Sequence, residues 1–134
     1  MEKQIMLTQQ DRTKLRKMIS DILLTELDGT GHVSALDVEL ERAAAVDSAE
    51  IPPDVITMRS RVRLAFGDDE DEEYTLVYPE EADMSENRIS VLSPVGTAIL
   101  GYRAGDVVSW DVPDGSIAIR INSVVYQPEA AGDE

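Results

Sequence analysis

The 134-residue chain has the length of one ordinary domain or two very small ones, and its 27 acidic and 12 basic side chains give a formal net charge of −15. This charge argues against a broad DNA- or RNA-binding surface and against binding to anionic membranes, because both ligands attract clustered lysine and arginine. The chain has no cysteine, which excludes a disulfide framework, a thiolate metal site and a thiol nucleophile.

The distribution of apolar and charged residues adds two expectations. No apolar run approaches the roughly 18 residues of a membrane span, and polar residues between Gln9 and Lys14 interrupt the place where a signal peptide would be apolar. A soluble, cytoplasmic protein is therefore expected. Residues 1–17 hold five basic and two acidic side chains, whereas the remainder is strongly acidic. This polarity favours a protein surface over a nucleic acid as the partner.

The N-terminal third predicts two helices. Thr8 followed by Asp11 resembles a capping box, and the apolar residues that follow recur at helical spacing, which predicts a helix over about residues 9–26. A second helix of about 13 residues is expected to open at Ser34, after a glycine-containing loop. Two amphipathic helices joined in this way predict an antiparallel hairpin, roughly 20 Å long.

Beyond Pro52-Pro53 the apolar period changes to alternation, which predicts strands. About five antiparallel strands are expected, with one short helix between the third and the fourth. Ser93-Pro94 predicts the start of that helix, with Ser as N-cap and Pro in the first turn. Residues 129–134 are interpreted as a frayed tail. The predicted fold class is α+β, with a helical arm over residues 1–49 and a sheet with one short helix over residues 50–134.

Patterns that carry chemistry are few. The acidic run 68–73 lacks the alternate spacing and the turn glycine of a calcium loop, and it is interpreted as a solvated hairpin tip. His32 is the sole histidine, so a zinc site has too few ligands. There is no nucleophile elbow and no glycine-rich phosphate loop, and capping explains Ser93. The sequence thus predicts no catalytic residue, metal or cofactor, and favours a protein-binding module with a projecting arm.

Five segments of the chain are similar to one known family. Its strongest signal is the pattern of Ser93-Pro94, two glycines and a Gly105-Asp106 pair. The segments are Glu39–Ala43, Ile51–Val62, Thr75–Pro79, Leu92–Asp106 and Tyr126–Asp133. Together they resemble the GreA/GreB superfamily of RNA-polymerase-binding factors, and the last segment resembles its branch of regulators of nucleoside diphosphate kinase. The resemblance covers most of the chain from about residue 36 onward.

The resemblance implies an N-terminal antiparallel coiled coil and a C-terminal FKBP-like domain. It also implies that the C-terminal domain docks on the rim of the RNA polymerase secondary channel while the arm points inward. Ser93 and Pro94 match the positions through which Gre factors contact the polymerase, and Val95 follows them. Leu92 departs from the polar residue that Gre factors often have there. The implied protein is a non-enzymatic, monomeric regulator with no membrane and no sequence-specific nucleic acid as partner.

The expected tip of the arm departs from the Gre pattern. In Gre factors an acidic pair at the tip of a longer hairpin helps to hold a catalytic magnesium ion in the polymerase. Glu26 and Asp28 lie near the tip here, but Thr30–Val33 replace the Gre tip pattern. We therefore expect no stimulation of transcript cleavage, and we interpret Glu26 and Asp28 as solvated helix ends. Two alternatives stay open: a Gre-type cleavage factor acting through these two acids, and a prolyl isomerase, which only the FKBP-like architecture suggests.

Overall fold

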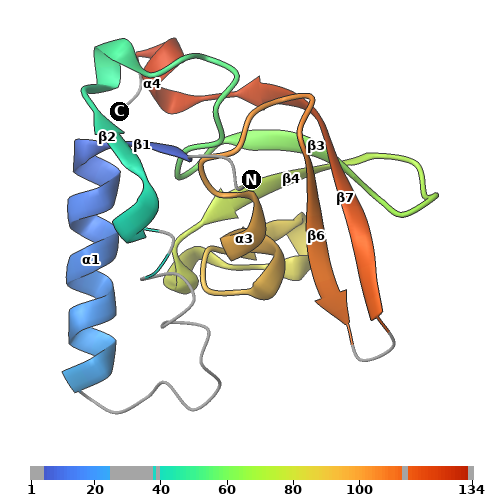
Figure 1. Cartoon of the computed structure of the whole chain (residues 1–134), viewed down its shortest axis with the longest axis horizontal. Coiled ribbons are helices and arrows are strands. Elements are labelled where there is room, and N and C mark those ends of the chain that lie inside the picture. Colours follow the sequence, from blue (N-terminus) through green and yellow to red (C-terminus); the bar gives the residue numbers. More distant parts are fainter. Residues whose placement is uncertain (1–4, 25–37, 39, 113–114, 133–134) are drawn as a thin grey trace.

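A computed structural model describes residues 5–24, 38, 40–112 and 115–132 of the chain. Its largest element is a five-stranded sheet with the order β5-β4-β3-β7-β6. The strands are β3 (Arg61–Phe66), β4 (Glu72–Val77), β5 (Arg88–Ser90), β6 (Val107–Val112) and β7 (Gly115–Tyr126). Figure 1 shows the sheet beside a long helix, α1 (Gln9–Leu24), with the short helix α3 (Pro94–Ile99) in front of the strands. The mixed helix-and-sheet class predicted from the sequence is confirmed.

The start of α1 follows the predicted cap, because the Asp11 backbone N–H donates to Thr8 Oγ1 at 3.0 Å. Immediately before the helix, β1 (Met6–Thr8) pairs in parallel with β2 (Ala44–Val46), a two-stranded sheet that the sequence analysis did not predict. Val38 and residues 40–42 are helical, but the expected second helix does not continue through Ala44. The Ala44 backbone N–H donates instead to the carbonyl of Ile5, which turns this segment into a strand.

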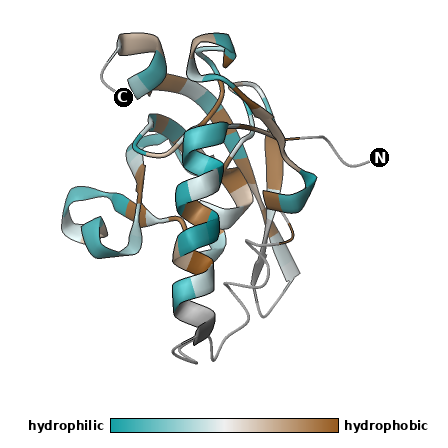
Figure 2. Cartoon of the chain, turned by 90° about the vertical axis from the view of Figure 1, so that its left-hand side faces the viewer, coloured by the Kyte–Doolittle hydropathy of each residue, from teal (hydrophilic) through white to brown (hydrophobic). Residues whose placement is uncertain are grey.

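Residues 25–37 lie outside the described part of the chain, and with them the predicted loop of the hairpin, Glu26, Asp28 and His32. The described part of α1 packs against the sheet module. Its buried side chains Leu15 and Ile19 belong to the same apolar cluster as Leu64 and Ile121 of the sheet. Burial of such a side chain stabilises a fold by about 2 kcal/mol. In Figure 2, where this side of the molecule faces the viewer, the helix exposes mostly hydrophilic residues. The division at residue 49 remains a prediction.

Strand direction departs from the expectation at one place. The β3–β4, β3–β7 and β6–β7 pairs are antiparallel, as predicted, but β5 runs parallel to β4. Antiparallel neighbours need only a tight turn, whereas a parallel pair needs a crossover. Residues 78–87 provide it through two 3-10 turns, η2 (Pro79–Glu81) and η3 (Met84–Glu86). Alternation of apolar residues indicates a strand but not its direction, so the sequence could not distinguish the two cases.

The C-terminal segment is also different from the prediction, because residues 129–131 are not frayed. They form the short helix α4 (Pro128–Ala131), which packs near the 3-10 turn η1 (Ser48–Glu50). Glu129 Oε1 accepts a hydrogen bond from Thr57 Oγ1 at 2.6 Å, and the buried Gln127 amide donates to the carbonyls of Pro52 and Val55 at 2.8 Å. These contacts hold the segment against the loop that precedes β3.

Candidate functional site

The start of α3 is fixed by one serine. Ser93 has extended backbone angles, φ −71° and ψ 157°, and its Oγ accepts from the Gly96 backbone N–H at 3.1 Å. The same hydroxyl donates to the carbonyl of Ser90 at 2.7 Å. The predicted N-cap is therefore confirmed. The Ser93 hydroxyl both donates and accepts a hydrogen bond within the fold. Its role is therefore to position the helix, and it is not available as a nucleophile.

α3 packs directly against the backbone of residues 90 and 91, at the end of β5. A Cβ placed on Gly96 would lie 2.1 Å from the carbonyl oxygen of Ser90, closer than real side chains come. One turn later Thr97 Oγ1 donates to the carbonyl of Val91 at 2.8 Å. The helix thus lies against the end of β5 with almost no freedom to slide.

The four residues predicted to bind the polymerase are contiguous in the structure but differ in exposure. Leu92 and Val95 are half-buried and pack against the apolar cluster, Ser93 is half-buried at the cap, and Pro94 is exposed. We call residues 92–95 the α3 edge. Pro94 is the member of this edge that presents its ring to solvent, so a partner that docks here would meet it first.

We expect Ser93→Ala to lower the free energy of unfolding by about 1 kcal/mol, because helix N-caps contribute that much. Urea unfolding followed by circular dichroism measures the loss. Ser116→Ala, at an exposed strand position, is the control and should stay within about 0.5 kcal/mol of the parent chain. A Ser93→Ala chain as stable as the parent would show that the cap is dispensable.

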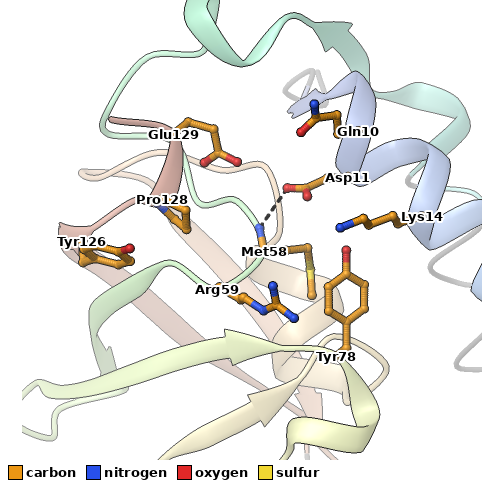
Figure 3. Close-up of a pocket in the computed structure, with 9 residues that line it drawn as sticks. All are labelled: Gln10, Asp11, Lys14, Met58, Arg59, Tyr78, Tyr126, Pro128 and Glu129. Atoms are coloured by element: carbon orange, nitrogen blue, oxygen red, sulfur yellow. Dashed lines mark hydrogen bonds between the residues drawn. The ribbon is translucent and has the colours of Figure 1, made fainter. Parts of the chain in front are cut away.

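A second candidate site, not predicted from the sequence, lies between α1 and the turn that precedes β3 (Figure 3). Asp11 extends from α1, and its Oδ2 accepts from the Met58 backbone N–H at 3.1 Å. Burial, with a smaller contribution from the negative charge of Glu129, raises the pKa of Asp11 to about 6. A carboxylate that looked like part of a capping box thus fastens the helix to a turn 47 residues away.

The opposite wall of this pocket holds Tyr78 and Arg59. The Arg59 guanidinium lies 5.6 Å from the centre of the Tyr78 ring, and its Nε donates to Glu81 at 3.2 Å. The Tyr78 hydroxyl is buried and has no hydrogen-bond partner in the described part of the chain. Burial raises the pKa of Tyr78, so its hydroxyl remains protonated at neutral pH. No sequence signal pointed to this pocket, because its lining residues come from separate parts of the chain, among them α1, the turn before β3 and the position directly after β4.

Neither site resembles a metal centre. Among the described residues no three His, Cys, Asp or Glu side chains are grouped closely enough to hold a metal ion. The acidic run 68–73 does not gather its carboxylates either: Asp71 pairs with Arg63 at 2.8 Å, while Glu72 and Glu73 belong to β4. In the same described part of the chain, every helix is too short or too polar to cross a membrane.

Residues 51–126, which contain the α3 edge, match the family model described as "Transcription elongation factor, GreA/GreB, C-term". The match covers more than half of the chain, so the protein belongs to the GreA/GreB family of transcription elongation factors. The solved structure of a prokaryotic transcription elongation factor GreA/GreB from Nitrosomonas europaea is similar, with a TM-score of 0.76 and 38% identity. The alignment covers 92% of this chain and 100% of that one.

Two relatives show which members of this family the chain is similar to. The regulator of nucleoside diphosphate kinase from Escherichia coli (strain K12) is 43% identical over 117 residues, which are 84% of this chain and 86% of that protein. Transcription elongation factor GreA from Clostridium botulinum (strain Eklund 17B / Type B) is 43% identical over 86 residues, 63% of this chain but only 54% of that protein. The resemblance inferred from the sequence is confirmed.

Proposed function

We propose that this protein binds RNA polymerase at the rim of the secondary channel through the α3 edge. The observation that carries the proposal is the exposed Pro94 on a helix that is capped by Ser93 and seated on backbone at Gly96. A rigid, partly apolar edge of this kind suits docking, because little conformational entropy is lost on binding. The edge also lies within the residues that match the GreA/GreB family.

The proposed activity is regulation without catalysis, by a monomer that needs no cofactor. The described part of α1 has 16 residues, a length of about 24 Å, and its buried side chains pack into the apolar cluster of the sheet module. The similarity to GreA leaves 46% of that protein unmatched, since the alignment covers 54% of it. Glu26 and Asp28 belong to residues that the structure does not describe, and the departure of Thr30–Val33 from the Gre tip supports the absence of cleavage stimulation.

Retention on core RNA polymerase tests the docking step. We expect Pro94→Glu to weaken retention at least tenfold, because a charge would replace the exposed apolar ring at the centre of the contact. An acidic residue is tolerated in the first turn of a helix, so the fold should persist. Pro53→Glu, at another exposed proline, is the matched control and should bind normally. Equal retention of both variants and the parent would contradict the proposed edge.

Stalled, backtracked polymerase complexes test the proposal that the protein does not stimulate transcript cleavage. We expect the protein to leave the RNA of these complexes at its original length, even at concentrations that saturate binding. Shortening of the RNA that disappears in Asp28→Asn would instead establish the Gre-type alternative and refute the proposal of a non-cleaving regulator.

A further inference from the structure

Two adjoining hollows lie between α1 and the Met58–Arg59 turn. The inner hollow, of about 220 Å³, is the pocket of Figure 3, and an outer one of about 430 Å³ continues along α1 past Lys17. Three residues line both hollows: Lys14, Arg59 and Tyr78. Each ends in a hydrogen-bond donor, and no carboxylate is common to the two. The shared wall is thus made of donors, although the protein as a whole is strongly acidic.

The strongest single feature of this wall is the Tyr78 hydroxyl. The residue is only 9% exposed, and its hydroxyl finds no partner among the described residues. Leaving a buried hydroxyl unpaired is unfavourable, so a group that accepts a hydrogen bond from it would be stabilised there. In Figure 3 the hydroxyl points into the pocket, on the side from which the Lys14 ammonium approaches.

The two cationic side chains on this wall, Lys14 and Arg59, also have hydrogen-bond donors that no described group accepts. Within the described part of the chain, Lys14 makes no ion pair. Arg59 uses its Nε for Glu81, while no described group accepts from its terminal amino groups. The Arg59 backbone is left-handed, with φ 65°, a conformation that non-glycine residues rarely adopt and that often marks functional positions.

The acids of the inner hollow are already engaged. Asp11 accepts from the Met58 backbone N–H, and Glu129 accepts from Thr57 Oγ1. Asp21 and Glu80 line only the outer hollow. The groups that lack partners where the hollows meet are therefore donors, and a ligand there must supply acceptors.

We propose that Lys14, Arg59 and Tyr78 form a binding site for a tetrahedral oxyanion of the phosphate class. The three donors come from three parts of the fold: Lys14 from α1, Arg59 from the turn before β3, and Tyr78 from the position directly after β4. A tetrahedral anion offers separate oxygens to donors from several directions, whereas a carboxylate offers two oxygens in one plane. Lysine and arginine supply the charge, and the phenol adds a charge-assisted hydrogen bond inside a partly desolvated pocket.

Titration of the full-length, isotope-labelled protein with inorganic phosphate and with glycerol 3-phosphate, followed by NMR, tests the site without polymerase. We expect saturable shifts of the Lys14, Met58 and Arg59 amide signals with at least one of the two anions. Binding of both would indicate recognition of the phosphate group alone, and binding of the ester only would indicate an organic phosphate. We expect Tyr78→Phe and Lys14→Gln each to weaken the binding about tenfold.

Arg120→Gln is the matched control, because it removes one exposed positive charge that lines neither hollow. It should bind phosphate as the parent does. Added phosphate should also raise the thermal midpoint of the parent more than that of Tyr78→Phe, a variant that keeps the ring beneath Arg59. Three results would overturn the proposal: no saturation with either anion, equal shifts with chloride at matched ionic strength, or unchanged affinity in a folded Tyr78→Phe.

Discussion

Gly96→Ala is expected to destabilise the protein by about 3 kcal/mol or more and to abolish retention on RNA polymerase. Alanine normally favours a helix over glycine by about 1 kcal/mol, so propensity alone predicts a more stable chain. The structure predicts the opposite, because the new Cβ would lie 2.1 Å from the Ser90 carbonyl oxygen and 3.0 Å from Val91 Cα. Both atoms belong to the backbone and cannot rotate away, so α3 must lift off β5. Overpacking costs about 1–3 kcal/mol and occasionally more, and a clash with backbone belongs at the upper end of this range.

Urea unfolding and the polymerase retention assay measure the two effects. Gly105→Ala is the control: its φ of +94° makes alanine strained, but no atom lies within 4 Å of the added Cβ. We expect a loss of about 1 kcal/mol and normal retention for that variant. A Gly96→Ala chain as stable as the parent would show that α3 is not seated as described, and the proposed docking edge would lose its main support.

The elements that could be predicted from the sequence are those fixed by local chemistry. Thr8 and Ser93 cap their helices through hydrogen bonds to residues three positions on, which a sequence pattern can reveal. Alternation indicated strands beyond Pro52-Pro53, because one face of a strand such as β3 or β4 contacts the apolar cluster.

The elements that were missed depend on distant partners. β1 and β2 are three residues each and exist because residues 6–8 pair with residues 44–46. The parallel course of β5 depends on the crossover at residues 78–87, and α4 is held by a bond from Thr57 to Glu129, 72 residues apart. Short segments with such long-range contacts have no periodic pattern from which they could be predicted.

The same distinction applies to the two candidate sites. The α3 edge is a continuous run, residues 92–95, so a family pattern could indicate it. The second site brings Lys14 to Arg59 and Tyr78 from three separate elements, and each residue taken alone is ordinary. Asp11 was expected to act within its own helix turn. In the structure its carboxylate also accepts a hydrogen bond from the Met58 backbone N–H, in the turn before β3.

This contact gives Asp11 an unusual effect on stability. An aspartate in the unfolded chain has its ordinary pKa of 3.8. In the folded chain burial, helped by the negative charge of Glu129, raises the pKa of Asp11 to about 6, although the Met58 hydrogen bond and the Lys14 charge oppose the shift. Between these pH values the folded chain binds more protons than the unfolded chain, so the Asp11 contribution to the free energy of unfolding falls as pH rises from about 4 to 6.5. A shift of this size corresponds to about 3 kcal/mol, and because the side chain is only half-buried we expect about 1–2 kcal/mol.

Asp11→Asn is therefore expected to be more stable than the parent at pH 7.5 and to lose this advantage as the pH is lowered to 4. The amide oxygen can still accept from Met58, while the cost of a buried charge is gone. Urea unfolding of both chains across this pH range isolates the effect, since other carboxylates cancel in the difference. Asp71→Asn should show the opposite slope, because hydrogen bonds from Arg63 and Asn122 lower the pKa of Asp71. A difference between Asp11→Asn and the parent that is independent of pH would mean that the Asp11 carboxylate is solvated and that α1 is not fastened to the turn through it.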